Sequence, residues 1–412
     1  MNNLRRIFLL PKHKKKYMSR RYSVFSNIKS KIEMIGPITI ADYMREVLTN
    51  PKAGYYMKND VFGMHGDFIT SPEVSQLFGE ILAVWTICEW QKLGKPFPCQ
   101  LIELGPGRGT MMLDILRVYE KLNIVGSKNS LSIHLVEISR VMSQFQAKKL
   151  CATDSVVEMD ELDDKNFGCY QQGFTPRSSI PIYWYPDFRY VPKAFSIIIA
   201  HEFFDALPIH KFQKEDDEWR EVLIDISQEE SNQLRFVLSR SPTPASLLFT
   251  KNEKIRDHFE VSPQAGLIME QISLGLEEKG GFALVVDYGH EGEKTDTFRA
   301  FSHHSLHNPL IEPGTADLTA DVDFSYLRKA TANRLISLGP IPQHLFLSKM
   351  HIDVRLKKLL EVCDNKEEKE QLISGYHMLM DKDKMGERFK IMSFFPAVLS
   401  DFLKKFPVTG FG

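Results

Sequence analysis

Residues 100–110 constrain the fold of this chain more than any other segment. They read Gln-Leu-Ile-Glu-Leu-Gly-Pro-Gly-Arg-Gly-Thr, a short apolar run that ends on a carboxylate and continues into three glycines separated by single residues. The run is bounded by Pro98 and is typical of a buried parallel strand. Gly105, Gly107 and Gly109 permit positive φ and leave no Cβ in a ligand's way, and the residues after them have helical spacing. The segment therefore predicts a strand, a tight turn and a helix start at which a ligand contacts backbone.

The glycine spacing narrows the choice of ligand. A dinucleotide fingerprint has its third glycine where this chain has Thr110, and an acid about 20 residues later. Here the acid comes first, as Glu103, and the next strand-like run, residues 132–137, ends on Glu137. We expect Glu137 to accept both hydroxyls of a ribose and Glu103 to face a cation. A dehydrogenase is a disfavoured alternative. A purely structural alternative is a glycine turn that only begins a helix, in some other kind of α/β protein.

The pattern resembles motif I of the S-adenosylmethionine-dependent methyltransferases, E/D-x-G-x-G-x-G. The ligand of that motif carries a sulfonium, an amino acid group and a ribose. The resemblance implies an α/β fold with the Rossmann-like sheet of a class I methyltransferase, and S-adenosylmethionine as cofactor. Trp184, at the end of another predicted strand, could stack on adenine, and a place in the core is the alternative. The cofactor-binding candidates are Glu103, Gly105, Gly107, Gly109, Thr110, Glu137 and Trp184.

The length of 412 residues suits one large α/β domain with additions or two domains, and we expect the α/β domain over residues 100–412. We expect a mostly helical N-terminal region over residues 36–99, a β-hairpin-like insertion at about 215–245 and a C-terminal extension from about 296. The last strand, near residues 389–395, is expected to close the sheet. The other strands are expected near 100–104, 132–137, 181–185, 195–200 and 282–287, and helices of the extension near 323–336, 350–362 and 366–380.

Charge is divided unevenly along the chain. Residues 1–31 hold ten Lys and Arg and no acid, which leaves 42 basic against 53 acidic residues in the remainder. This composition looks like a mitochondrial transit peptide, so we expect cleavage at about residues 20–35 and a location in the mitochondrial matrix. A nucleic-acid-binding arm or nuclear signal at residues 12–16 is the alternative. We expect no nucleic-acid partner, because the acidic remainder offers no second basic patch.

Composition excludes several other classes. No run approaches the ~20 apolar residues of a transmembrane helix, so no membrane span is expected. The five cysteines are scattered and never form C-x-x-C, which predicts neither a disulfide framework nor a zinc site. The acidic run at residues 312–323 has no glycine at the sixth position and no terminal Glu, both of which a calcium loop needs, and His303 and His304 have no metal-ligand spacing. No metal is predicted.

A second group of polar residues follows the apolar run at 195–200. His201, Glu202 and Asp205 fall at the carboxyl edge of the sheet, where open α/β sheets bind ligands. Methyl transfer from a sulfonium is an in-line displacement, and two carboxylates suit a cationic acceptor. Guanidinium fits best, since its rigid fork pairs with a carboxylate. We predict Glu202 and Asp205 to be catalytic; in the alternative Asp205 caps a helix that begins at Ala206 and Glu202 forms a structural ion pair.

Polar loops elsewhere are candidates for the acceptor side. Asp67, Ser71 and Asp317 are predicted to bind substrate. Ser71 precedes Pro72 and is also an N-cap candidate. Asp317 lies in an acidic run that could instead cap helices.

Eight sequence blocks resemble the MidA family, in order and over roughly residues 36–395. The family looks like class I methyltransferases. Its mitochondrial member is a type II-like protein arginine methyltransferase that makes symmetric dimethylarginine on a core subunit of respiratory complex I and aids assembly of the complex. The resemblance implies that activity and that partner here. A non-catalytic assembly factor or scaffold that binds S-adenosylmethionine is the alternative, and the oligomeric state is left open. The blocks are residues 54–56, 62–73, 103–110, 134–137, 201–208, 287–290, 313–319 and 385–389.

Overall fold

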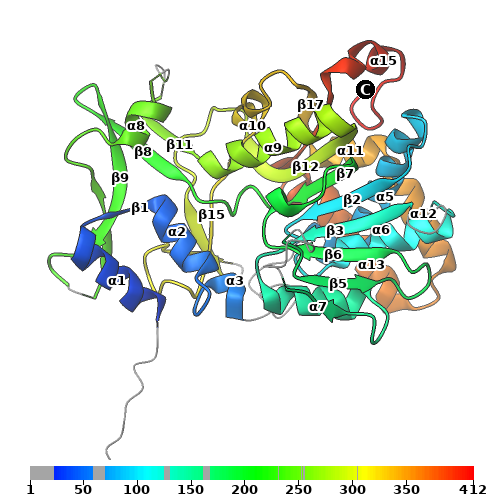
Figure 1. Ribbon diagram of the computed structural model, residues 1–412, viewed down its shortest axis with the longest axis horizontal. Coiled ribbons are helices and arrows are strands. Elements are labelled where there is room, and N and C mark those ends of the chain that lie inside the picture. The colour runs from blue at the N-terminus through cyan, green and yellow to red at the C-terminus, as the bar shows by residue number, and fades with distance from the viewer. Residues whose placement is uncertain are drawn as a thin grey trace, which may run out of the picture.

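The computed structural model describes residues 23–58, 70–124, 130–160, 168–230, 232–251, 253, 256–303 and 305–412. Figure 1 shows two lobes, one built on a large twisted sheet and the other on smaller sheets that lie beside the N-terminal helices. The predicted α/β class is confirmed. None of the helices in the described part of the chain is long and apolar enough to cross a membrane.

The central sheet has ten strands in the described chain. Strands β2, β3, β6, β7 and β12 are parallel to one another, whereas β18 is antiparallel to both of its neighbours. The chain runs outward from β2 in both directions, so the switch point lies between β2 and β7, where such sheets bind ligands. The order is β17 (Leu335–Pro342), β18 (Phe389–Pro396), β12 (Gly281–His290), β7 (Phe195–His201), β2 (Cys99–Leu104), β3 (Leu131–Val136), β6 (Pro181–Tyr185), β5 (Gln171–Phe174) and β4 (Val157–Glu158), with β16 (Val322–Asp323) beside β12.

Helices cover both faces of this sheet. Successive side chains of a strand point to opposite faces, so Ile197 and Ile199 of β7 pack with one layer of helices and Ile198 and Ala200 pack with the other. The first layer is α5 (Gln76–Lys92), α6 (Thr110–Lys121), α7 (Arg140–Leu150), α11 (Gln343–Lys349), α12 (Ile352–Val362), α13 (Lys366–Met380) and α15 (Ser400–Lys405), and the second is α9 (Pro263–Lys279) and α10 (Phe324–Ala330). Short helices α4 (Ser71–Val74) and α14 (Met385–Arg388) join the first layer.

Most predicted elements of the central sheet are confirmed, but one prediction is wrong. The helix expected over 323–336 ends at Ala330, and β17 begins at Leu335. This strand contains Gly339 and Pro340, residues that discourage a strand prediction. An edge strand tolerates them because it pairs on one side only, and the register of β17 shifts at this point. The strand β18 therefore does not close the sheet, because β17 lies outside it.

The second lobe gathers segments that are distant in sequence. Its five-stranded sheet contains β1 (Ile38–Thr39), β8 (His210–Glu215), β9 (Glu218–Ile226), β10 (Leu234–Leu238) and β11 (His258–Val261), and its three-stranded sheet contains β13 (Arg299–Ser302), β14 (Ser305–His307) and β15 (Asp317–Thr319). The helices α1 (Val24–Ile35), α2 (Ile40–Thr49), α3 (Tyr55–Lys58) and α8 (Pro244–Phe249) belong to the same lobe. One apolar cluster joins α1 and α2 to strands of both small sheets.

The predicted domain boundaries are therefore corrected. The region 36–99 is not one unit, because β1 and α2 pack in the second lobe whereas α5 packs on the central sheet against α6. The insertion predicted at 215–245 is larger, since β8 and β11 lie outside those limits. The extension predicted from 296 supplies strands to both lobes. Such strand pairings are non-local, and hydrophobic pattern does not specify the partner strand.

The predicted boundary of the N-terminal leader also falls inside a packed element. Helix α1 begins at Val24, and Val24, Ile28 and Ile32 form a buried stripe with helical spacing. Residue 31 lies within this helix. The first two turns of this helix carry Lys29 and Lys31 beside the buried apolar stripe and no acid, so they have the composition of an amphipathic leader, although Glu33 follows in the same helix. Residues 1–22 lie outside the described part of the chain.

Candidate functional site

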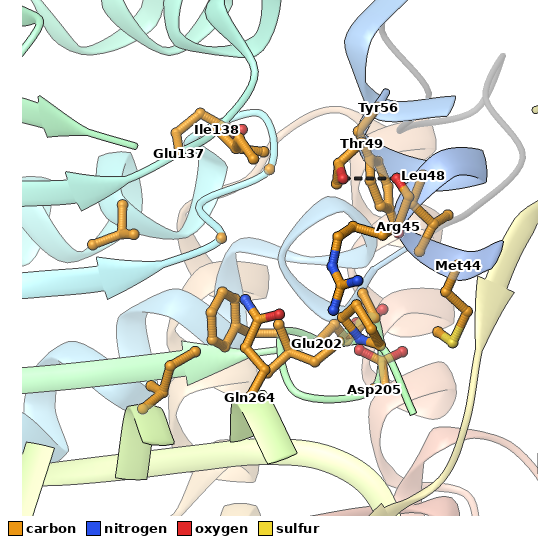
Figure 2. Close-up of a pocket in the computed structure, with 18 of the residues that line it drawn as sticks. Met44, Arg45, Leu48, Thr49, Tyr56, Glu137, Ile138, Glu202, Asp205 and Gln264 are labelled. Atoms are coloured by element: carbon orange, nitrogen blue, oxygen red, sulfur yellow. Dashed lines mark hydrogen bonds between the residues drawn. The ribbon is translucent and has the colours of Figure 1, made fainter. Parts of the chain in front are cut away.

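A cavity of about 350 Å³ lies between the carboxyl edge of the central sheet and the second lobe. The sheet side supplies the glycine turn, Glu137, Glu202 and Asp205. In Figure 2 Arg45 and Tyr56 reach into it from the side of α2 and α3. Its volume falls within the range of small-ligand sites. The cavity has a half built by the glycine turn and Glu137, here called the cofactor half, and a half built by Glu202, Asp205 and the second lobe, here called the acceptor half.

The glycine turn adopts the backbone that the sequence predicted. Gly105, Gly107 and Gly109 have φ values of 64°, 51° and 74°, in the left-handed region that favours glycine. A Cβ on Gly105 would stand 3.0 Å from the ring of Phe203. Gly109 is the N-cap of α6. Gly105 and Gly107 line the cavity, where they present backbone without a side chain.

Glu137 lines the cofactor half, and the buried Gln146 supports it from outside the cavity lining. The two carboxylate oxygens of Glu137 accept from the Ser139 N–H (2.7 Å) and from Gln146 Nε2 (3.0 Å). Gln146 Nε2 also donates to the Gly107 carbonyl at 2.6 Å. Burial raises the pKa of Glu137 to about 7. Gln146, on α7, therefore fixes both the acid and the turn, and no motif in the sequence pointed to it.

Trp184 does not line the cavity, and the expected stacking on adenine is corrected. Its side chain is fully buried in the core on the α5–α6 face, and its Nε1 donates to Gln146 Oε1 at 2.8 Å. The reason is strand alternation, which turns Trp184 to that face and Tyr185 to the other. The residues just beyond β6, Pro186, Asp187 and Phe188, line the cavity instead. Their position after a strand end was the signal that could have identified them.

Glu103 lies in a small annex of about 40 Å³ that shares Gly105, Gly107 and Glu202 with the main cavity. Its side chain is buried, and its Oε2 has no hydrogen-bond partner among the described residues. Burial, together with the neighbouring Glu137, raises the pKa of Glu103 to about 8. An orphaned buried carboxylate beside a bare glycine turn fits a ligand with a cationic group.

Thr110 lines the annex rather than the main cavity. Its hydroxyl bonds to a carboxylate oxygen of Glu73 on α4 and accepts from Lys149 Nζ at 2.6 Å. Arg108 Nη1 lies 3.4 Å from the other Glu73 oxygen. Thr110 therefore helps to join the turn to α4 and α7, and its hydroxyl is already engaged.

Glu202 and Asp205 are brought together in the acceptor half, as the sequence predicted. Glu202 has a left-handed backbone, φ 49°, which is uncommon outside glycine and is often found at functional sites. Its Oε1 lies 3.4 Å from the Ser71 N–H and 3.3 Å from His201 Nε2. Burial lowers the pKa of His201 to about 3, so this imidazole is neutral. Burial and the nearby Asp205 and Asp317 raise the pKa of Glu202 well above its usual range.

Asp205 faces the cavity from a turn rather than from a helix start. No helix begins at Ala206, and the next regular element is β8, so the helix-cap alternative is wrong. Oδ2 of Asp205 accepts from the Tyr288 hydroxyl and from the Thr319 hydroxyl (2.9 Å). Burial raises the pKa of Asp205.

Asp287 shapes the loop that carries both carboxylates. It is fully buried within β12, and its Oδ2 accepts hydrogen bonds from the N–H groups of Phe203, Phe204 and Asp205 at 3.2, 3.0 and 3.4 Å. Burial and the neighbouring Asp205 and Glu202 raise its pKa well above the usual range. Asp287 belongs to the sequence block 287–290, from which no role was predicted for it.

The three predicted substrate-binding residues have different outcomes. Asp317, on β15, lines the cavity and accepts the Tyr56 hydroxyl at 2.6 Å. Ser71 is fully buried with its hydroxyl 3.7 Å from Met385 Sδ, so only its backbone approaches Glu202. Thr70, not Ser71, is the N-cap of α4. Asp67 lies outside the described residues.

Comparison with known proteins decides the family. A family model described as "Putative S-adenosyl-L-methionine-dependent methyltransferase" matches residues 81–341, which include the glycine turn, Glu137, Glu202 and Asp205. The chain belongs to this family. The match confirms the resemblance to the MidA family and the expected cofactor, S-adenosylmethionine. Among the described residues no group of three side chains could hold a metal ion.

Two curated relatives of this methyltransferase cover most of its length. The human "Protein arginine methyltransferase NDUFAF7, mitochondrial" is 53% identical over 368 residues, 89% of this chain and 82% of the human one. The Drosophila melanogaster homolog of that name is 46% identical over 411 residues, 97% of this chain and 91% of the fly one. A crystal structure from Burkholderia thailandensis, bound to S-adenosyl-homocysteine, superposes with a TM-score of 0.71 at 20% identity, covering 91% of this chain and 92% of that one. This last likeness confirms the fold.

Proposed function

We propose that this methyltransferase modifies an arginine of a protein, a core subunit of respiratory complex I, and that it makes symmetric dimethylarginine during assembly of the complex. One observation carries the choice of acceptor: Glu202, Asp205 and Asp317 line the same cavity as the glycine turn. A guanidinium is the cation whose planar fork of donors best matches such carboxylates. The names of the human and fly relatives support the same acceptor.

The residues of the cofactor half bind and orient. S-adenosylmethionine, when bound, supplies a methyl group carried on a sulfonium. Glu137, placed after β3, would accept the ribose hydroxyls, and Glu103 would pair with a cationic group of the ligand. Gly105 and Gly107 would let it lie against the backbone. Gln146 keeps Glu137 and the turn in register through its three hydrogen bonds.

The residues of the acceptor half would hold the guanidinium and take its proton. An arginine side chain is protonated in water and has no lone pair with which to attack a methyl group. A carboxylate with a raised pKa, held against the guanidinium, is a stronger base than a solvated one. When the nitrogen–carbon bond forms and the carbon–sulfur bond breaks, one N–H proton passes to the carboxylate. The sulfur becomes neutral and the carboxylate becomes a neutral acid, while the methylated guanidinium keeps its positive charge. Atoms and charge therefore balance.

Location in the mitochondrial matrix belongs to the same proposal. The basic, acid-free residues at the N-terminus and the mitochondrial names of the relatives support it. Because α1 packs into the second lobe from Val24 onward, we expect a leader to be removed before Val24.

The test uses the protein from residue 23 onward, labelled S-adenosylmethionine and purified complex I core subunits. We expect label on an arginine of one subunit, with symmetric dimethylarginine found by mass spectrometry. Glu202→Gln, which keeps the shape of the side chain, is the control and should lower labelling while it still binds S-adenosylhomocysteine. Cofactor binding by the native protein without any label would refute the proposal and favour the scaffold.

A further inference from the structure

Within the described part of the chain, side-chain hydrogen bonds reach only one of the two carboxyl oxygens of Asp205. Its Oδ2 accepts from the hydroxyls of Tyr288 and Thr319, and those two hydroxyl oxygens lie 2.7 Å apart, so the three oxygens form a closed triangle. Its Oδ1 is buried and has no hydrogen-bond partner among the described residues. An oxygen in that state costs free energy unless a ligand donates to it. Oδ1 is therefore the free acceptor of a group whose other oxygen is fixed.

The two hydroxyls come from different lobes. Tyr288 is on β12 of the central sheet, and Thr319 is on β15 of the second lobe. A backbone hydrogen bond joins the same two regions, because the Ala320 N–H donates to the Asp205 carbonyl at 3.0 Å. Asp205 is thus a point at which the second lobe is attached to the catalytic edge of the sheet.

Several buried acids compete for ionisation in this half of the cavity, and they cannot all be charged. The oxygens of Asp287 are already used by backbone N–H groups. Glu202 is 3.4 Å from one N–H. Asp205 has two hydroxyl donors, and Arg299 and the backbone N–H of Ala206 also lower its pKa against the effect of burial. The charged or titratable groups around Asp205 are Tyr56, Glu202, Asp287, Tyr288, Arg299 and Asp317, and Arg45 lines the same cavity from α2.

We propose that Tyr288 and Thr319 are positioning residues that keep Asp205 ionised with Oδ1 directed at the acceptor, so that Asp205 rather than Glu202 takes the proton. The inference rests on the proposed function. The guanidinium donates one N–H to Oδ1. That proton becomes the O–H of a carboxylic acid as the nitrogen lone pair forms its bond to the methyl carbon and the carbon–sulfur bond breaks. The proton later leaves to solvent. Glu202 holds the remaining N–H groups in place.

The test is the pH dependence of kcat/KM for arginine methylation in two variants. Tyr288→Phe and Thr319→Val each remove one hydroxyl, so the pKa of Asp205 should rise. Because the base must be ionised, the acidic limb of the profile should move to higher pH by about one unit in each. Thr319→Ser keeps the hydroxyl and should keep the native profile. S-adenosylhomocysteine affinity should stay native in all three, which shows that the cofactor half is intact.

Tyr119→Phe is the matched control. It removes a buried hydroxyl that bonds to Thr86 at 2.9 Å between α5 and α6, away from the cavity, and it should leave the profile unchanged. If Tyr288→Phe does not fold, the contrast between Thr319→Val and Thr319→Ser decides. An acidic limb that stays in place in folded, active variants overturns the inference and leaves the proposed function standing. A native protein that methylates no arginine overturns both.

Discussion

The two halves of the cavity differ in how the chain builds them. The cofactor half comes from consecutive elements of one sheet, from β2 to the end of β6. The acceptor half joins the loop after β7 to the end of β12, to β15 and to α3. Local backbone geometry makes the first half, whereas docking of the second lobe completes the other. Cofactor binding and methyl transfer should therefore respond separately to mutation.

Asp205→Asn is expected to separate methyl transfer from cofactor binding most strongly. The substitution keeps the shape of the side chain but removes the base, so kcat should fall by about 10²–10⁴-fold. Affinity for S-adenosylhomocysteine, measured by calorimetry, should stay close to native, because Asp205 belongs to the acceptor half. A parallel loss of cofactor affinity would show that the two halves are not separable.

Gly105→Val should give the reverse pattern. Valine is strained at φ 64°, and its Cβ would meet Phe203 at 3.0 Å, so S-adenosylhomocysteine affinity should drop by about 100-fold. Gly275→Ala is the control, because nothing lies within 4 Å of that Cβ position in α9. It should bind like the native protein and melt at a slightly higher temperature. Native affinity in Gly105→Val would contradict the role of the turn.

Gln146→Leu should act more weakly on the same half. It leaves the Trp184 Nε1–H and the Gly107 carbonyl without the bonds they make now, at a cost of about 2–3 kcal/mol of unfolding free energy. We expect about tenfold weaker S-adenosylhomocysteine binding as Glu137 loses its support. Gln343→Leu removes another fully buried glutamine, bonded to the Leu379 carbonyl in the helical layer. This variant should lower stability in a denaturant titration without changing the affinity for S-adenosylhomocysteine. If Gln146→Leu and Gln343→Leu lose the same affinity, the effect of Gln146→Leu comes from lower stability alone.

The last expected effect concerns stability alone, as a slope of the unfolding free energy with pH. The folded pKa of Glu103, about 8, lies above its usual value of 4.5. The unfolded chain therefore loses its proton first, and the stability of the ligand-free protein should fall as pH rises from 4.5 towards 8. Glu103→Gln should flatten this slope in thermal melts taken across that interval. Cofactor binding should change the trend in the native protein, because a cationic ligand favours the ionised acid. A slope that is unchanged in the variant would remove Glu103 as its source.

The cofactor half was largely predictable from sequence. Gly105, Glu103 and Glu137 were found because a strand, a turn with positive φ and a helix start are properties of consecutive residues. Glu202 and Asp205 were found for the same reason, since both follow a strand end. Trp184 was misplaced because a strand end shows that a residue is near the edge but not which face its side chain takes.

The acceptor half and the second lobe were predicted less completely. Thr319 is 114 positions from Asp205 along the chain, and the β1 pairing joins Ile38 to Ile224. Hydrophobic pattern specifies that a strand forms but not which distant strand it pairs with. The hairpin was therefore predicted correctly, but the insertion that contains it is larger than the predicted residues 215–245.

The parallel sheet, the glycine turn and the carboxylates at the strand ends follow from the sequence, because each depends on the conformation and the side chains of neighbouring residues. The groups that control those carboxylates come from packing between distant elements. Gln146 holds Glu137, Asp287 fixes the loop of Glu202, and Tyr288 with Thr319 binds one oxygen of Asp205. These contacts join elements that meet only when both lobes pack, since a hydrogen bond requires proximity in space and not in sequence.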